Sequence, residues 1–67
     1  MKTEYVYCAV NKYGEIQWVY GSSRKTRYFK TTRYLSHAIR CHNEESTKDP
    51  WRMIRFELTN PVEEPLD

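Results

Sequence analysis

The chain has 67 residues, of which 30% are charged and 15% are aromatic, and its formal net charge is +2. A chain of this length forms one domain with a small core, and this composition is too aromatic for a disordered protein and too charged for a membrane span. The sequence has neither a glycine-rich phosphate loop nor spacing typical of a nucleophile beside its base. We therefore expect no enzymatic activity and no cofactor.

The two cysteines lack both the CxxC spacing and the number typical of a disulfide scaffold. The first residues lead into an alternating pattern and not into an apolar stretch, which argues against a signal peptide or an anchor. These features predict a cytoplasmic protein that does not associate with a membrane.

Charge is distributed unevenly, because no acidic residue occurs between Glu15 and Glu44. A basic surface of this kind is typical of a protein with an anionic partner, although a solvated face balanced by carboxylates after folding is the alternative. The sequence leaves both open. The interval contains six basic residues: Arg24, Lys25, Arg27, Lys30, Arg33 and Arg40.

Three strands are predicted in the N-terminal half from β-branched and aromatic residues, at Glu4–Val10, Glu15–Gly21 and Thr26–Lys30. The residues from Asn11 to Gly14 have turn chemistry and predict a hairpin between the first two strands. In the first strand we expect Val6, Cys8 and Val10 to face the core.

A helix should follow, capped by Thr31 or Thr32 and ending at Asn43, and a fourth strand should span Trp51–Leu58. The helix carries an apolar stripe that must cover the sheet, formed by Leu35, Ala38, Ile39 and His42.

The predicted fold class is α+β, a single small domain at residues 1–58 in which one helix packs on an antiparallel sheet of three to four strands, in the order β-β-β-α-β. Residues 59–67 are acidic and contain proline, and we expect them to form a disordered tail.

If the first strand buries its valines, four large side chains lie on the sheet face opposite the helix: Tyr5, Tyr7, Trp51 and Met53. Such residues are enriched in protein interfaces, which makes this face a candidate protein-binding surface. The alternative is that they pack across the strands and stiffen the sheet.

His37 and Cys41 have the i, i+4 spacing that places two metal ligands on one helical face. Cys8 is expected beneath the apolar stripe, and these two residues point away from that stripe. The candidate ligands therefore diverge, and the sequence predicts no metal site.

The region from Val10 to Leu58 resembles small uncharacterised phage and prophage proteins. The resemblance implies an accessory protein that binds a host factor, often one that handles nucleic acid or serves in defence, in the cytoplasm of the host cell. It is carried by Phe29-Lys30-Thr31, Leu35, Ala38, His42-Asn43, Trp51, Ile54 and Phe56.

A second resemblance is to three-stranded DNA-binding domains of the AP2 and integrase-arm type, on the outline of Trp18, Gly21, Phe29, Thr32 and Ala38. It implies that Arg24, Lys25 and Arg27 contact bases, while Lys30 and Arg33 contact phosphates. The predicted fourth strand departs from that family.

The sequence therefore favours a non-catalytic protein that docks on a host protein and modulates it. Nucleic-acid binding through the basic region from Arg24 to Arg40 is the alternative. Pairing between two copies through an exposed strand edge stays open.

Overall fold

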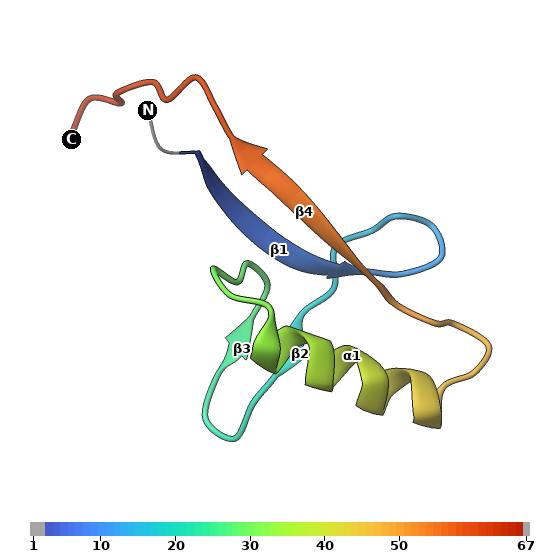
Figure 1. Ribbon diagram of the computed structural model, residues 1–67. Helices are drawn as coiled ribbons and strands as arrows, with labels where there is room; N and C mark the ends of the chain where they lie inside the picture. Colours follow the sequence, from blue (N-terminus) through green and yellow to red (C-terminus); the bar gives the residue numbers. More distant parts are fainter. Residues whose placement is uncertain (1–2, 67) are drawn as a thin grey trace.

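The computed structural model describes residues 3–66 and confirms the α+β class, with one helix and antiparallel strands (Figure 1). The four strands form two separate two-stranded sheets, β1 with β4 and β2 with β3, where the sequence suggested a single sheet. In chain order the elements are β1 (Glu4–Val10), β2 (Val19–Tyr20), β3 (Lys25–Thr26), α1 (Arg33–Glu45) and β4 (Arg52–Leu58).

The longest ladder joins β1 and β4 over seven residue pairs, from Glu4 opposite Leu58 to Val10 opposite Arg52. The other edge of β1 makes only isolated bridges, Tyr7 with Phe29 and Val10 with Ile16. β1 is therefore the central strand, and it is flanked on one side by β4 and on the other by short pieces of irregular chain.

The predicted turn after β1 is present, and the Asn11 side chain holds it. Its Oδ1 accepts hydrogen bonds from the backbone N–H groups of Tyr13 and Glu15, at 3.0 and 2.9 Å. Gly14 has a φ of 80°, a conformation that suits glycine. The predicted second strand is much shorter than expected, because after the Ile16 bridge the chain leaves β1 and pairs with β3.

Helix α1 begins after Thr32, although the Thr32 hydroxyl makes no capping hydrogen bond. The helix continues to Glu45, so the prediction that Asn43 ends it is wrong. The Asn43 side chain instead bonds the backbone of Trp51: Oδ1 accepts from N–H at 2.8 Å and Nδ2 donates to C=O at 3.1 Å. These two bonds tie the helix to the start of β4.

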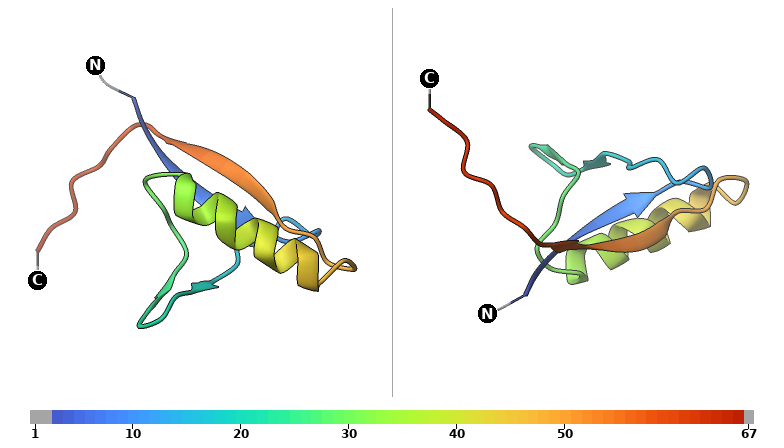
Figure 2. Two further views of the ribbon diagram at one scale, coloured as in Figure 1. Left: turned by 60° about the horizontal axis from the view of Figure 1, so that its bottom comes forward. Right: turned by 90° about the horizontal axis from the view of Figure 1, so that it is seen from above.

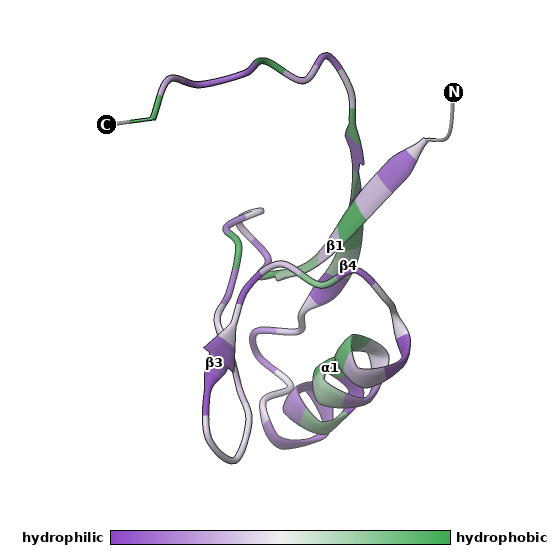
Figure 3. Ribbon diagram, turned by 90° about the vertical axis from the view of Figure 1, so that its left-hand side faces the viewer, coloured by the Kyte–Doolittle hydropathy of each residue, from purple (hydrophilic) through white to green (hydrophobic). Residues whose placement is uncertain are grey.

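The core forms where β1, β2 and α1 meet, from Ala9, Val19, Leu35 and Ile39. The predicted apolar stripe of α1 is thereby confirmed for Leu35 and Ile39, and Ala38 packs against the same cluster. Looking roughly along α1, Figure 3 shows β1 and β4 above the helix and β3 at its left.

The face of β1 turned to the helix is the opposite of the one predicted. Ala9 belongs to the core cluster, whereas Cys8 and Val10 are buried outside it. Both sets of alternating residues in β1 are apolar enough to be buried, so alternation could not choose between them. Packing against Leu35 and Ile39 of α1 selects the face that carries Ala9.

The other face of the β1–β4 pair holds Val6 opposite Phe56 and Cys8 opposite Ile54. At the far end of the pair this face is open, since Phe56 is 42% exposed and Leu58 is 51% exposed.

This end of the ribbon projects beyond the helix, and residues 59–66 continue away from it (Figure 2). The radius of gyration is consequently 14.1 Å, above the value of about 11 Å typical of a compact chain of this length. Residues 59–66 are exposed and form neither helix nor strand, and Asp67 lies outside the described residues. Within residues 3–66, no helix has the length and apolar character needed to cross a bilayer.

Replacing Asn43 by Ala should lower the free energy of unfolding by about 1–3 kcal/mol, because the N–H and C=O of Trp51 then lose their partners. Urea denaturation followed by circular dichroism measures the change. Glu44→Ala, at an exposed position one residue further along the helix, is the matched control and should change stability by less than about 0.5 kcal/mol. Equal effects of the two variants would contradict this account of the α1–β4 connection.

Candidate nucleic-acid interface

The short β2–β3 hairpin and its flanking residues carry a group of basic and aromatic side chains. Val19 pairs with Thr26 and Tyr20 with Lys25, and the Gly21 N–H donates to the Arg24 carbonyl at 2.7 Å. Val19 is buried in the core and anchors the hairpin to α1. The aromatic neighbours of Val19 in the chain are exposed, Trp18 by 39% and Tyr20 by 73%.

Two cations lie against the indole ring of Trp18. Lys25 Nζ is 4.9 Å and Arg27 Cζ is 4.5 Å from the ring centroid, and Arg27 Cζ is also 5.1 Å from the ring of Tyr28. Cation–π contacts of this kind hold long basic side chains in place at little cost in desolvation. Arg27 Nε is buried without a hydrogen-bond partner. We call Trp18, Tyr20, Arg24, Lys25, Arg27 and Tyr28 the basic hairpin.

The structure separates the six predicted basic residues into groups. Arg24, Lys25 and Arg27 lie together on the hairpin. Lys30 lies at the other end of β1, in a hollow with Glu4 and Leu58. Arg33 is the first residue of α1 and is exposed. Arg40 borders a hollow on the β4 side of the helix, together with Ser36, Ile39 and Met53.

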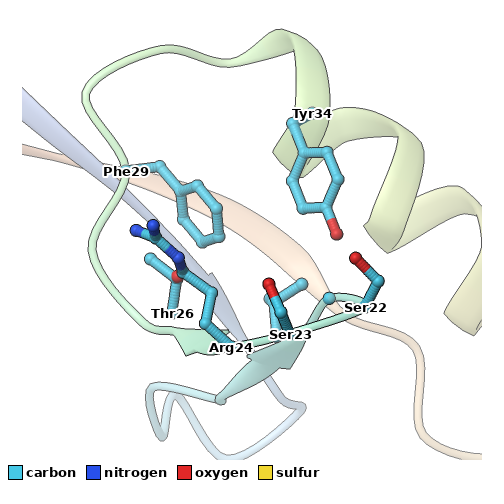
Figure 4. Close-up of a pocket in the computed structure, with 8 residues that line it drawn as sticks. Ser22, Ser23, Arg24, Thr26, Phe29 and Tyr34 are labelled. Atoms are coloured by element: carbon cyan, nitrogen blue, oxygen red, sulfur yellow. The ribbon is translucent and has the colours of Figure 1, made fainter.

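A cleft of about 310 Å³ separates the hairpin turn from the start of α1. Hydroxyl groups of Ser22, Ser23 and Tyr34 face this space beside Arg24 (Figure 4). Phe29 forms its apolar wall, with its ring centroid 6.1 Å from that of Tyr34. Hydroxyls and a guanidinium are the groups that contact phosphates and sugars in nucleic-acid complexes.

A second groove, of about 440 Å³, runs along β2 and the C-terminal half of α1. Most of the residues that line it have aromatic rings, among them Trp18, Tyr20, Tyr34 and His37. Glu45 lies in the groove at the C-terminal end of the helix. The exposed rings therefore border an elongated space next to the basic side chains.

The face predicted to bind protein is partly buried and turned toward the helix. Tyr7, Trp51 and Met53 are partly buried and pack against the core cluster, so their predicted position opposite the helix is wrong. The reason is the reversed orientation of β1, which turns these residues toward α1. Tyr5 lies on the same side, and the guanidinium of Arg55 covers its ring at 4.3 Å.

Trp18, Tyr20 and Tyr28 were not among the site residues predicted from the sequence. The residues that flank an inward-facing β2 residue must point away from the core, which is the signal that selects the first two. That signal became usable only once Val19 was known to be the buried residue of β2.

The histidines and cysteines occupy separate places. Cys41 Sγ lies 3.5 Å from His37 Nε2 on the exposed side of α1. His42 stacks on Trp51, with ring centroids 3.6 Å apart, and its Nε2 lies 2.9 Å from the Asp49 carbonyl oxygen. Among residues 3–66 there is no cluster of three or more side chains able to hold a metal ion.

Cys8 is fully buried, and its burial raises the pKa of the thiol above the ordinary value of 9.0, while the positive charge of Arg27 opposes this rise. The folded protein consequently keeps the thiol proton at a pH at which the unfolded chain releases it. The stability that this group contributes is present below about pH 9 and is lost as the pH rises further.

We expect Ellman's reagent at pH 8 to modify Cys41 rapidly and Cys8 only after unfolding, because one thiol is exposed and the other is buried. The free energy of unfolding should also fall more steeply above pH 9 in the wild type than in Cys8→Ala. Rapid modification of both thiols in the folded protein would contradict the burial of Cys8.

Comparison with known proteins gives no family for this chain. No protein-family model matches it, and neither a curated protein nor a solved structure is significantly similar to it. Its function must therefore be argued from the surface described above.

Proposed function

We propose that this protein is a small, non-catalytic binding module whose basic hairpin binds single-stranded nucleic acid. The observation that carries this proposal is the Trp18 ring with Lys25 and Arg27 against it, next to exposed Tyr20 and Tyr28. Proteins that bind single strands combine positive charge that follows the phosphate backbone with aromatic rings on which bases stack.

The cations and hydroxyls supply the phosphate contacts in this proposal. Arg24 borders the hydroxyl-lined cleft, Lys25 follows it directly in the chain, and Arg27 comes two residues later. Since no carboxylate occurs between Glu15 and Glu44, the positive potential of the hairpin is not cancelled by its own neighbours in the sequence. Glu45 lies in the second groove, and its carboxylate repels phosphate. We therefore expect the surface that binds nucleic acid to end there.

The aromatic rings supply the base contacts. Tyr20 and Tyr28 are exposed by 73% and 52%, so their rings are accessible to unstacked bases. Stacking of this kind tolerates many sequences, because every base presents an aromatic face. Duplex binding by a sheet is less well supported, since β2 and β3 have only two residues each and do not extend into a three-stranded platform.

Docking on a host protein, the function that the sequence favoured, remains a prediction. The surface chosen for it packs against the core through Tyr7, Trp51 and Met53. For this reason we choose the basic hairpin, and not that surface, as the candidate binding site.

Replacing Arg24, Lys25 and Arg27 together by Ala should weaken binding to a labelled single-stranded oligonucleotide by tenfold or more at low salt. The slope of log K against log salt concentration should become shallower by about 2, because each phosphate contact on a single strand contributes about 0.7. Fluorescence anisotropy over a range of salt concentrations measures both quantities for DNA and for RNA.

The matched control removes three positive charges from elsewhere, with Lys12, Lys48 and Arg52 replaced by Ala. All three residues are exposed and lie outside the basic hairpin. This control should retain most of the affinity. If both triple variants lose affinity equally, the net charge of the protein and not the basic hairpin determines its affinity for the oligonucleotide. Failure of the wild-type protein to bind either oligonucleotide at low salt would refute the proposal.

Replacing Tyr20 or Tyr28 by Leu should weaken binding by about 1–3 kcal/mol while leaving the salt slope unchanged, because a lost stacking contact releases no counterions. Tyr13→Leu is the control. Tyr13 is also exposed and also lies beside a lysine, with Lys12 Nζ 5.3 Å from its ring centroid, but it belongs to the turn after β1. An equal loss in the control would argue against stacking on the hairpin.

A further inference from the structure

The outer edge of β4 is an unpaired strand edge. The N–H and C=O of Tyr7 both bond Phe29, at 2.7 and 2.9 Å, so they point away from β4. Because these groups alternate in direction along an antiparallel strand, Val6 and Cys8 direct theirs toward β4, where they meet Phe56 and Ile54. Met53, Arg55 and Glu57 must therefore direct their backbone groups to the outer edge of β4.

No other strand within residues 3–66 pairs with this edge. β4 has seven residues, and its end near Leu58 projects past α1, as Figures 1 and 2 show. A long strand with an uncovered edge is a template for pairing with another chain. The identity of that chain can be inferred from the side chains along β4.

Pairing of β4 with itself in antiparallel orientation allows few registers, because the outward-directed groups of both copies must meet. One register places Arg55 opposite Arg55, and another places Glu57 opposite Glu57, so both set like charges directly against each other. The register between them places Arg55 of each copy opposite Glu57 of the other. Of these three registers, only this one pairs opposite charges.

The same register also matches the apolar side chains. Phe56 then lies on the two-fold axis opposite Phe56 of the second copy, and Ile54 lies opposite Leu58. The Phe56 pair occupies a position without mutual backbone hydrogen bonds, where antiparallel strands bring side chains closest. Phe56 and Leu58 are 42% and 51% exposed in the single chain, so this pairing removes apolar surface from water.

We propose that two copies of this protein associate through β4 in this register and form a continuous four-stranded sheet in the order β1-β4-β4-β1. Four charged side chains make two reciprocal Arg55–Glu57 pairs across the axis. Arg55 reaches its partner by leaving the ring of Tyr5, over which its guanidinium lies at 4.3 Å. The proposal is independent of nucleic-acid binding, because the contact lies on β4 and includes no residue of the basic hairpin.

Sedimentation equilibrium of the full chain tests the proposal. The wild type should reach twice the monomer mass of 8.2 kDa at high concentration. Arg55→Glu and Glu57→Arg, each alone, should raise the dimer dissociation constant by about tenfold or more, since each sets like charges opposite one another. Both residues are exposed, and circular dichroism verifies that the variants fold.

An equimolar mixture of the two single variants provides the decisive measurement. Arg55→Glu presents two carboxylates per copy and Glu57→Arg presents two guanidinium groups, so the mixture should form a heterodimer although each variant alone stays monomeric. The double variant Arg55→Glu with Glu57→Arg should dimerise as the wild type does. A wild type that stays monomeric at all concentrations overturns the proposal, and so does a mixture that does not associate.

Discussion

Close packing of α1 against the small side chain of Ala9 is the contact on which the rest of this structure depends. Leu35 and Ile39 lie against Ala9 and Val19, which joins the helix, the central strand and the hairpin in one cluster. A chain of this length buries little surface, so a single cluster has to organise all of its elements. Once Ala9 faces the helix, strand alternation determines which residues of β1 and β4 point toward α1 and which point to the opposite face of the sheet.

Two consequences follow for the surface. On β4, Phe56 and Leu58 are turned to the open face, and the outer edge of the strand is left without a neighbour in residues 3–66. On the hairpin, burial of Val19 turns Trp18 and Tyr20 outward, and Trp18 lies beside the cations of Lys25 and Arg27. The same core contact thus positions both the candidate nucleic-acid interface and the candidate dimer edge, at separate places on the molecule.

The two surfaces use charge in different ways. On the hairpin, Lys25 and Arg27 lie against aromatic rings, which orders their side chains while leaving the positive charge uncompensated. On β4, Arg55 and Glu57 are two residues apart with opposite charges, so two antiparallel copies of the strand can pair each arginine with a glutamate. An uncompensated cluster suits a polyanion, and a self-complementary strand suits a second copy.

The sequence alone determined the elements with strong local signals. Alternation predicted β1 with its observed bounds and β4 to within one residue, and helical spacing predicted the stripe of Leu35 and Ile39. It also indicated the basic run that contains Arg24, Lys25 and Arg27.

The sequence did not determine which face of β1 turns to the helix, because both faces of β1 are apolar and only packing against α1 selects the one with Ala9. The end of the helix was also decided by tertiary structure, since Asn43 bonds the backbone of Trp51, eight residues further along the chain, and does not terminate α1. Strand pairing is likewise a long-range contact, so only the folded chain could show that β1 pairs with β4 and that the hairpin stands apart as its own small sheet.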